Sequence, residues 1–376
     1  MSTHFIDETR RNPSHAILAG LWLAPVILAA TLAVTEAARI MIPPPDLNAV
    51  ASVRTRAASY RSDAPGLEGN IVLALVIDSS HPATLYAGTL WGGVFKTGDS
   101  GASWNQTGLA HTGVFSLVID PTNRATLYAG GNGVFKSTDG GRSWIAIDSD
   151  LTELNATVAL VIDPTNPATL YAGTSYGSVF KTSDGGATWT AVDSGLPADS
   201  VYSLAIDPTR PSTLYAGTYQ GVFATSNSGR RWSGVSSGLG ESSVNALVID
   251  PSHPATLYAG TPRGVFKTTN GGKRWAAVGS DLNLNSLAID PASPSTLYAG
   301  GDGVVFKSTD GGASWSGLSS GIGAAFVNAL AIDASNPARV YAGTYAGVFT
   351  SVDGGASWTG ASSGLTARAL SRRTIA

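Results

Sequence analysis

One segment recurs seven times along this 376-residue chain, and its period constrains the fold more than any other feature. Each copy holds an aspartate directly after an apolar run, as in "VID" or "AID", and neighbouring copies lie 40 to 44 residues apart. The seven aspartates are Asp78, Asp120, Asp163, Asp207, Asp250, Asp290 and Asp333. A period of about 40–45 residues built from short strands is typical of propeller blades.

Each copy divides into four short runs with turn residues between them. In the copy from Val244 to Val278 the runs are Val244–Ile249, Thr256–Thr261, Gly264–Thr268 and Arg274–Val278. The first run is almost wholly apolar, as expected of an innermost strand that is buried on both faces. The sequence therefore predicts an all-β fold: a single seven-bladed β-propeller over residues 70–365, with four-stranded antiparallel blades.

A second pattern, Ser/Thr-x-Asp-x-Gly-x-Ser/Thr-Trp, keeps step with the first. Its acidic or amide residue is Asp99, Asp139, Asp184, Asn227, Asn270, Asp310 and Asp353. Its tryptophan is Trp104, Trp144, Trp189, Trp232, Trp275, Trp315 and Trp358. The side-chain oxygen can accept hydrogen bonds from its own tight turn, and the tryptophan can be buried between sheets. Because asparagine serves in two copies, ionisation is not required, so we expect a structural role and no catalytic residue here.

This pattern matches the Asp-box, or BNR, motif of sialidase-type propellers, and the match covers about residues 70–365. The segment "LAIDPTRPSTLYAGTYQGVF" (Leu204–Phe223), with an Asp-box after it, resembles the photosystem II assembly and stability factor propellers and their bacterial kin. That resemblance implies a seven-bladed, exported, non-catalytic ring that acts as a chaperone-like binding platform.

Antiparallel strands decide which turns share a face of the ring. The turns between strands one and two and between strands three and four lie on one side and are nearly uniform. The other side, here called the variable face, carries the remaining loops. Its second-to-third turns contribute Trp91, Asn132, Tyr176, Tyr219, Gln220, Arg263, Asp302 and Tyr345. Its fourth-to-first loops add His111, Glu153, Asp199, Glu241, Asn285 and Phe326. Aromatic and polar side chains around a ring mouth predict a surface that binds a protein or a glycan.

A glycoside hydrolase of the same fold, sialidase- or xyloglucanase-like, is the alternative. Resemblance to sialidases would imply an arginine triad, but only Arg263 falls clearly on the variable face. Xyloglucanase-like relatives would imply paired carboxylates in a cleft between two propellers, and this chain encodes one. A two-carboxylate glycosidase built from Asp199, Glu241 or Asp302 stays open, because spacing across a ring cannot be deduced from sequence.

The N-terminal residues predict export. Arg10 and Arg11 precede the uncharged, mostly apolar run Ala16–Val34, which at ~1.5 Å per residue would span roughly 28 Å, close to the membrane core. We expect residues 1–15 in the cytoplasm, residues 16–34 as an uncleaved signal-anchor or a cleaved signal peptide, and the rest outside the cytoplasm, periplasmic or at the cell surface. The membrane is therefore an expected partner through this N-terminal helix.

Two further segments flank the predicted ring. Residues 35–69 are expected to form a linker, in which Ser59–Leu67 aligns with the fourth-strand segment Arg231–Leu239 and puts Tyr60 at the tryptophan position. This extra strand either helps to close the ring or is a vestige. Residues 366–376 are expected to form a flexible basic tail.

The amino-acid composition argues against several kinds of ligand and partner. The chain has no cysteine, and its five histidines are scattered, so neither a metal site nor a cofactor is predicted. Residues 70–365 carry 20 acidic and 14 basic side chains, so nucleic acid is not an expected partner. Five lysines share one position on the third strand, where they are expected to extend along a blade edge: Lys96, Lys136, Lys181, Lys267 and Lys307. We expect a monomeric ring.

Overall fold

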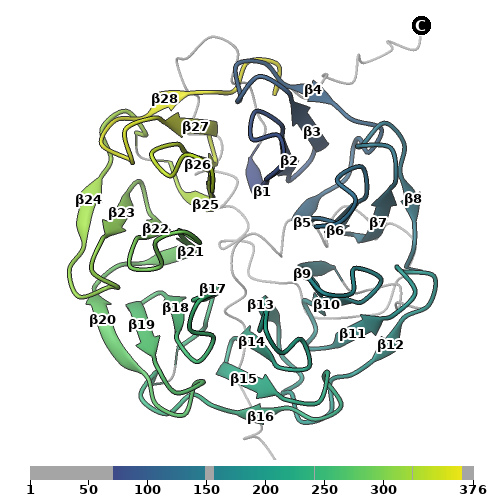
Figure 1. Ribbon diagram of the computed structural model, residues 1–376, viewed down its shortest axis with the longest axis vertical. Coiled ribbons are helices and arrows are strands. Elements are labelled where there is room, and N and C mark those ends of the chain that lie inside the picture. Colours follow the sequence, from purple (N-terminus) through teal and green to yellow (C-terminus); the bar gives the residue numbers. More distant parts are fainter. Residues whose placement is uncertain (1–70, 149–155, 241, 324, 366–376) are drawn as a thin grey trace, which may run out of the picture. The chain divides into compact units, whose positions relative to one another are not determined.

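The structure, a computed structural model, describes residues 71–148, 156–240, 242–323 and 325–365. These residues form seven four-stranded sheets, each made of four consecutive antiparallel strands, and the sheets are the blades of a ring (Figure 1). The predicted all-β, seven-bladed fold with four-stranded antiparallel blades is confirmed. The expected segments 1–15, 16–34, 35–69 with its strand at 59–67, and 366–376 lie outside the described residues. None of the described residues belongs to a helix with the length and apolarity needed to cross a membrane.

The first four blades use strands β1 to β16. Blade 1 consists of β1 (Val72–Ile77), β2 (Leu85–Thr89), β3 (Gly93–Thr97) and β4 (Asn105–Gln106). Blade 2 consists of β5 (Val114–Ile119), β6 (Leu127–Gly131), β7 (Gly133–Ser137) and β8 (Ile145–Ala146). Blade 3 consists of β9 (Thr157–Ile162), β10 (Leu170–Thr174), β11 (Val179–Thr182) and β12 (Thr190–Ala191). Blade 4 consists of β13 (Val201–Ile206), β14 (Leu214–Thr218), β15 (Gly221–Thr225) and β16 (Ser233–Gly234).

The last three blades use strands β17 to β28. Blade 5 consists of β17 (Ala246–Ile249), β18 (Leu257–Thr261), β19 (Gly264–Thr268) and β20 (Ala276–Ser280). Blade 6 consists of β21 (Leu284–Ile289), β22 (Leu297–Gly301), β23 (Val305–Ser308) and β24 (Ser316–Leu318). Blade 7 consists of β25 (Val327–Ile332), β26 (Val340–Thr344), β27 (Gly347–Ser351) and β28 (Thr359–Gly360).

The core lies between neighbouring blades. All five residues of every second strand are buried, and the glycine in this strand is needed for close packing. A Cβ on Gly88 would lie 2.6 Å from Val114 of the next blade, a contact that real Cβ atoms essentially never make. The glycine of the "YAG" triplet is therefore required because the innermost strand of the next blade packs directly against it.

Tryptophans of the Asp-boxes join each blade to the one before it. The indole N–H groups of Trp104, Trp189, Trp232, Trp275, Trp315 and Trp358 donate to backbone oxygens of the preceding blade at 2.7 to 3.2 Å. The acceptors are, in the same order, Ala361, Ile147, Val192, Val235, Val278 and Leu318. Trp144 differs, since its indole donates to Thr107 Oγ1 of blade 1 and to Gly141 O in its own turn.

The third-strand lysines make the reverse connection, toward the next blade. Lys136 Nζ lies 5.3 Å from the centroid of the Tyr128 ring and donates to Gly185 O in the next Asp-box at 2.9 Å. Equivalent lysine contacts link Lys96 with Gly140, Lys267 with Gly311 and Lys307 with Gly354. The expectation that these lysines only extend along a blade edge is incomplete, because their ammonium groups join adjacent blades.

Blades 7 and 1 meet through contacts of the same kind. A Cβ on Gly343 would lie 2.7 Å from Val72, close to the 2.6 Å between a Cβ on Gly88 and Val114 where blades 1 and 2 meet. Trp104 donates its indole N–H to Ala361 O at 2.7 Å, and Asn328 Nδ2 donates to Val72 O at 3.0 Å. Among the described residues, each blade is built from its own four strands, so this junction is made by side-chain and backbone contacts between complete blades.

Candidate functional site

The structure places all eight candidate binding residues in turns between second and third strands. These turns lie beside the beginnings of the innermost strands, as Leu90 N shows by donating to Ile71 O at 2.9 Å and Ser175 N by donating to Ala156 O at 3.0 Å. The residues are Trp91, Asn132, Tyr176, Tyr219 with Gln220, Arg263, Asp302 and Tyr345, so each blade supplies at least one. They share one face but are spread around the ring.

Three of these side chains stand out by exposure. Trp91, Tyr176 and Tyr219 are 46%, 56% and 39% exposed. Among the described residues, the other large hydrophobic side chains with comparable exposure are Ile145 and Val352, which lie on or beside third and fourth strands. All the aromatic members of this exposed group therefore lie on the variable face.

In five of the seven blades, the turn that carries these residues is held by a threonine that was not among the residues predicted from the sequence, whereas Gly131 and Gly301 stand at this position before Asn132 and Asp302. Thr218 Oγ1 accepts a hydrogen bond from Gln220 N and donates one to Gly221 O, both at 3.1 Å. Thr261 makes the same pair of bonds with Arg263 N and Gly264 O at 3.0 Å. The sequence does contain a sign of this threonine, because the segment "YAGT" recurs in five of the seven copies. Such bonds fix the backbone beneath an exposed side chain and so reduce the entropy lost on binding.

One part of the variable face brings predicted residues into contact. Asp302 forms a backbone bridge with Phe326, and the ring centroids of Phe326 and Tyr345 are 5.1 Å apart. Asp302 of blade 6 and Tyr345 of blade 7 therefore flank the same loop residue. The candidate acid Asp199 accepts a hydrogen bond from Ser200 N at 2.8 Å, and Glu153 and Glu241 lie outside the described residues.

The arginines lie on the faces of the ring that the order of the strands predicts for them. Arg263 is exposed on the variable face, whereas the arginines of the first-to-second turns lie on the opposite side and are engaged there. Arg210 Nη2 lies 3.1 Å from Asp207 Oδ2, and Arg339 Nη1 donates to Ser100 Oγ at 3.1 Å. Within the described ranges, this arrangement supplies one arginine to the variable face rather than a triad.

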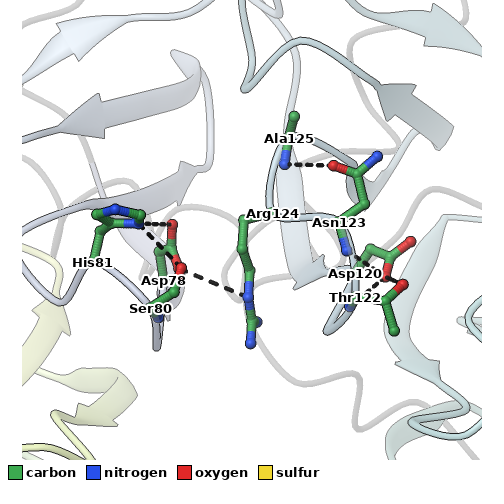
Figure 2. A network of polar contacts seen from close by, with 8 residues as sticks. All are labelled: Asp78, Ser80, His81, Asp120, Thr122, Asn123, Arg124 and Ala125. Carbon is green, nitrogen blue, oxygen red and sulfur yellow. Dashed lines mark hydrogen bonds and ion pairs between the residues drawn. The ribbon is translucent and has the colours of Figure 1, made fainter.

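The first-to-second turns form polar networks around their aspartates (Figure 2). Asp78 Oδ1 accepts hydrogen bonds from the backbone N–H of Ser80 at 2.9 Å and from its hydroxyl at 2.6 Å, and Arg124 Nε of blade 2 lies 3.8 Å from the same oxygen. Burial raises the pKa of Asp78, but these hydrogen bonds outweigh it and hold the pKa below its usual value. The described residues contain no group of three or more side chains able to hold a metal ion.

The Asp-boxes are closed hydrogen-bonded turns on the same side. Asp139 Oδ1 accepts from Ser143 N at 2.9 Å and Ser137 Oγ at 2.9 Å, and its Oδ2 accepts from Ser143 Oγ at 2.6 Å. The Ser143 hydroxyl bond, with the other hydrogen bonds, lowers the pKa of Asp139 to about 2. Asn227 Oδ1 accepts the equivalent bonds from Arg231 N at 3.0 Å and Thr225 Oγ1 at 2.8 Å. The box carboxylate is thus occupied by its own turn, and an amide oxygen can replace it.

The inner strands line an axial hollow that the sequence reasoning overlooked. Leucine and isoleucine occupy equivalent positions in all seven blades, as in Leu75 and Ile77 of β1. On the side of the first-to-second turns, residues from six of the seven innermost strands line a cavity of about 500 Å³ with Arg124 at its edge. Apart from Arg124, the side chains that line this hollow are apolar and offer no group for catalysis.

Comparison with known proteins supports the fold. No family model matches the sequence, and no curated protein matches it. The GH74 xyloglucanase from Xanthomonas campestris has a TM-score of 0.65 and 20% identity over 81% of this chain and 56% of its own. YCF48 from Cyanidioschyzon merolae has a TM-score of 0.60 and 16% identity over 77% of this chain and 96% of its own. The chain therefore shares the seven-bladed propeller fold of these proteins, and its blades carry the Asp-box turns described above.

These likenesses differ in how much of each known protein they cover. This propeller spans little more than half of the xyloglucanase, whereas it matches nearly the whole length of YCF48. A structure titled "YCF48 bound to D1 peptide" also matches, with a TM-score of 0.57 and 14% identity over 76% of this chain and 94% of its own. At such identities the likeness concerns the fold alone.

Proposed function

We propose that this propeller is a non-catalytic binding platform that captures a polypeptide on its variable face outside the cytoplasm, tethered through its N-terminal apolar segment. The observation that carries the proposal is the placement of Trp91, Tyr176 and Tyr219, the three most exposed large aromatic side chains of the described residues, on one face. Tyrosine, tryptophan and arginine dominate the energetics of protein interfaces. Arg263, exposed on the same face, completes this set.

Two further observations favour a binding role. The threonine-fixed turns present these side chains on a rigid backbone, which suits recognition without a large ordering cost. The whole-length likeness to YCF48, a protein whose structure is known with a bound D1 peptide, is consistent with peptide binding by a ring of this size. An assembly-factor-like role would follow if the captured polypeptide belongs to a membrane complex.

The binding test compares a variant of the variable face with a control variant that changes exposed side chains elsewhere. The face variant is Trp91→Ala, Tyr219→Ala, Arg263→Ala, and the control is Ile145→Ala, Val352→Ala, which removes exposed apolar side chains elsewhere (62% and 65% exposed). Proteins recovered from an envelope extract are quantified for each. We expect the control to recover the wild-type partner, and the face variant to lose it, because each interface anchor contributes about 2 kcal/mol, or roughly 30-fold in affinity. Equal recovery by the two variants would contradict the proposal.

The location is tested separately. A reporter fused after Leu365 should be active outside the cytoplasm, and the full-length protein should fractionate with membranes if the N-terminal segment is retained. Cytoplasmic reporter activity would refute the assignment.

The hydrolase alternative has a direct assay. The purified ring is incubated with xyloglucan and with aryl-glycosides, and released sugar is measured. We expect the unmodified ring to release no more sugar than its Asp302→Asn variant. Turnover that this substitution abolishes would replace the binding proposal with a glycosidase.

A further inference from the structure

Two neighbouring Asp-boxes depart from the repeat in the same way. In blade 4 the box has Asn227 in place of the aspartate and the pair Arg230–Arg231 before its tryptophan. In blade 5 it has Asn270 and the pair Lys273–Arg274. Each of these boxes therefore loses a carboxylate and carries two cations, and the two blades adjoin.

The departures leave the turns intact and the cations exposed. Asn270 Oδ1 accepts from Arg274 N at 3.0 Å and from Thr268 Oγ1 at 2.9 Å, as the aspartates do elsewhere. All four basic side chains are exposed, and none forms a salt bridge with a described residue. By contrast, Lys267 is held between a tyrosine ring and a backbone oxygen. The four cations are therefore free to meet an external anion.

The two pairs lie at opposite ends of one exposed stretch of chain. β16 begins just after Arg231 and runs along the rim of blade 4 (Figure 1). The far end meets the next box, because Trp275 donates its indole N–H to Val235 O at 2.7 Å and its backbone N–H to Ser237 O at 2.8 Å. The backbone beside Arg274 therefore meets this stretch at Ser237, six residues after Arg231, which at ~3.3 Å per residue is at most about 20 Å away.

The stretch between the pairs is neutral. It reads "SGVSSG" (Ser233–Gly238), with small residues and no charge or proline, and four of its six residues are exposed. A linear ligand can therefore lie along it without a repulsive or bulky side chain in the path. We name the four cations with this stretch the basic bracket.

We propose that the basic bracket binds an extended acidic polypeptide segment, with two anionic clusters several residues apart, at a surface separate from the variable face. The two-point spacing suits a chain with carboxylates several residues apart better than a single phosphate. An anionic membrane is disfavoured because the ring as a whole carries six more acidic than basic side chains and would be repelled by a wide negative surface. A short peptide senses chiefly the local charge, because salt screens beyond about 8–10 Å.

The test repairs the two boxes to the pattern of the other five. The variant Asn227→Asp, Arg231→Ser, Asn270→Asp, Arg274→Ser lowers the net charge by four and copies turns that the chain already forms, such as that of Asp139 and Ser143. The control adds four negative charges at the exposed alanines of the other boxes: Ala102→Glu, Ala187→Glu, Ala313→Glu and Ala356→Glu. Both variants thus have the same net charge, and circular dichroism melting checks that each folds.

The probe is the labelled peptide Glu-Glu-Thr-Ser-Thr-Glu-Glu, measured by fluorescence polarisation. We expect saturable binding to the wild type, at least tenfold weaker binding to the box-repair variant, and binding within threefold of wild type for the control. A peptide of the same composition with its four glutamates contiguous should bind the wild type more weakly.

Several results would overturn the proposal: no saturable peptide binding to the wild type, equal weakening in both variants, or equal affinity for the contiguous peptide. Binding to vesicles containing phosphatidylglycerol, or to inorganic phosphate, with no peptide binding would also refute it. Since none of these substitutions touches the variable face, the outcome is independent of the proposed function.

Discussion

Removing the indole of Trp232 tests whether the Asp-box tryptophans join the blades. Trp232 is 2% exposed and packs in a cluster that includes Tyr171 and Val201, and its Nε1 donates to Val192 O of blade 3 at 2.7 Å. A buried tryptophan removes roughly 200 Å² of apolar surface from water, which at ~25 cal/mol/Å² gives about 5 kcal/mol. We therefore expect Trp232→Ala to lower the free energy of unfolding by about 4–5 kcal/mol, within the usual range for such truncations.

Trp232→Phe separates packing from hydrogen bonding. It keeps most of the ring but removes the N–H, so we expect a loss of about 1–2 kcal/mol. Trp144→Ala is the matched control, because this tryptophan is only partly buried and its indole donates to a side chain and to its own turn. Its loss should be about half that of Trp232→Ala.

Thermal unfolding followed by circular dichroism measures all three variants. At roughly 2 °C per kcal/mol for a ring of this size, Trp232→Ala should lower Tm by about 8–10 °C. A shift below about 2 °C, or an equal shift for Trp144→Ala, would refute the inter-blade role.

Three further predictions concern other contacts. Asp139 has a pKa of about 2 in the folded protein against an ordinary 3.8, so the stability that its charge contributes is fully present above about pH 4 and is lost as the pH falls toward 2. We therefore expect Asp139→Asn to make the decline of Tm between pH 4 and pH 2 shallower. An unchanged slope would contradict this. Lys136→Met should cost about 1–2 kcal/mol by removing the contacts with Tyr128 and Gly185, whereas Lys273→Met, at an exposed position, should leave Tm unchanged. Gly343→Ala should cost about 1–3 kcal/mol, because its Cβ would lie 2.7 Å from Val72 at the junction of blades 7 and 1, while Gly360→Ala, with nothing within 4 Å, is the control.

The fold was predictable because its information is local and repeated. The innermost apolar run, the turn aspartate and the Asp-box each specify a strand or a turn within a few residues, and seven copies in register leave a closed ring as the arrangement that buries every blade face. The assignment of turns to two faces needed only the antiparallel order of strands. For that reason Trp91 and Tyr345 could be placed on one face from sequence alone.

Contacts between blades were not predictable in the same way. The partner of Lys136 is a backbone oxygen 49 residues later. Because every residue has a backbone carbonyl, the sequence does not indicate which one accepts this hydrogen bond. Likewise, the sequence contains the apolar runs of every inner strand, but only the closed ring shows that residues from six of them line one hollow. Whether residues on different turns act together depends on distances across the ring, which periodicity does not determine.

In a ring of near-identical blades, the positions that break the repeat carry the most information about ligands. A residue present in all seven copies is explained by what every blade must do, as the buried "YAG" and the Asp-box turn show. The boxes of blades 4 and 5 keep the turn hydrogen bonds through Asn227 and Asn270, so folding does not require their extra cations. Folding likewise does not require an exposed tryptophan at position 91, since the equivalent turn of blade 2 has Asn132. Among the described residues, the variable face and the basic bracket are thus surfaces where this chain departs from what its fold demands, and substitutions there should change binding far more than stability.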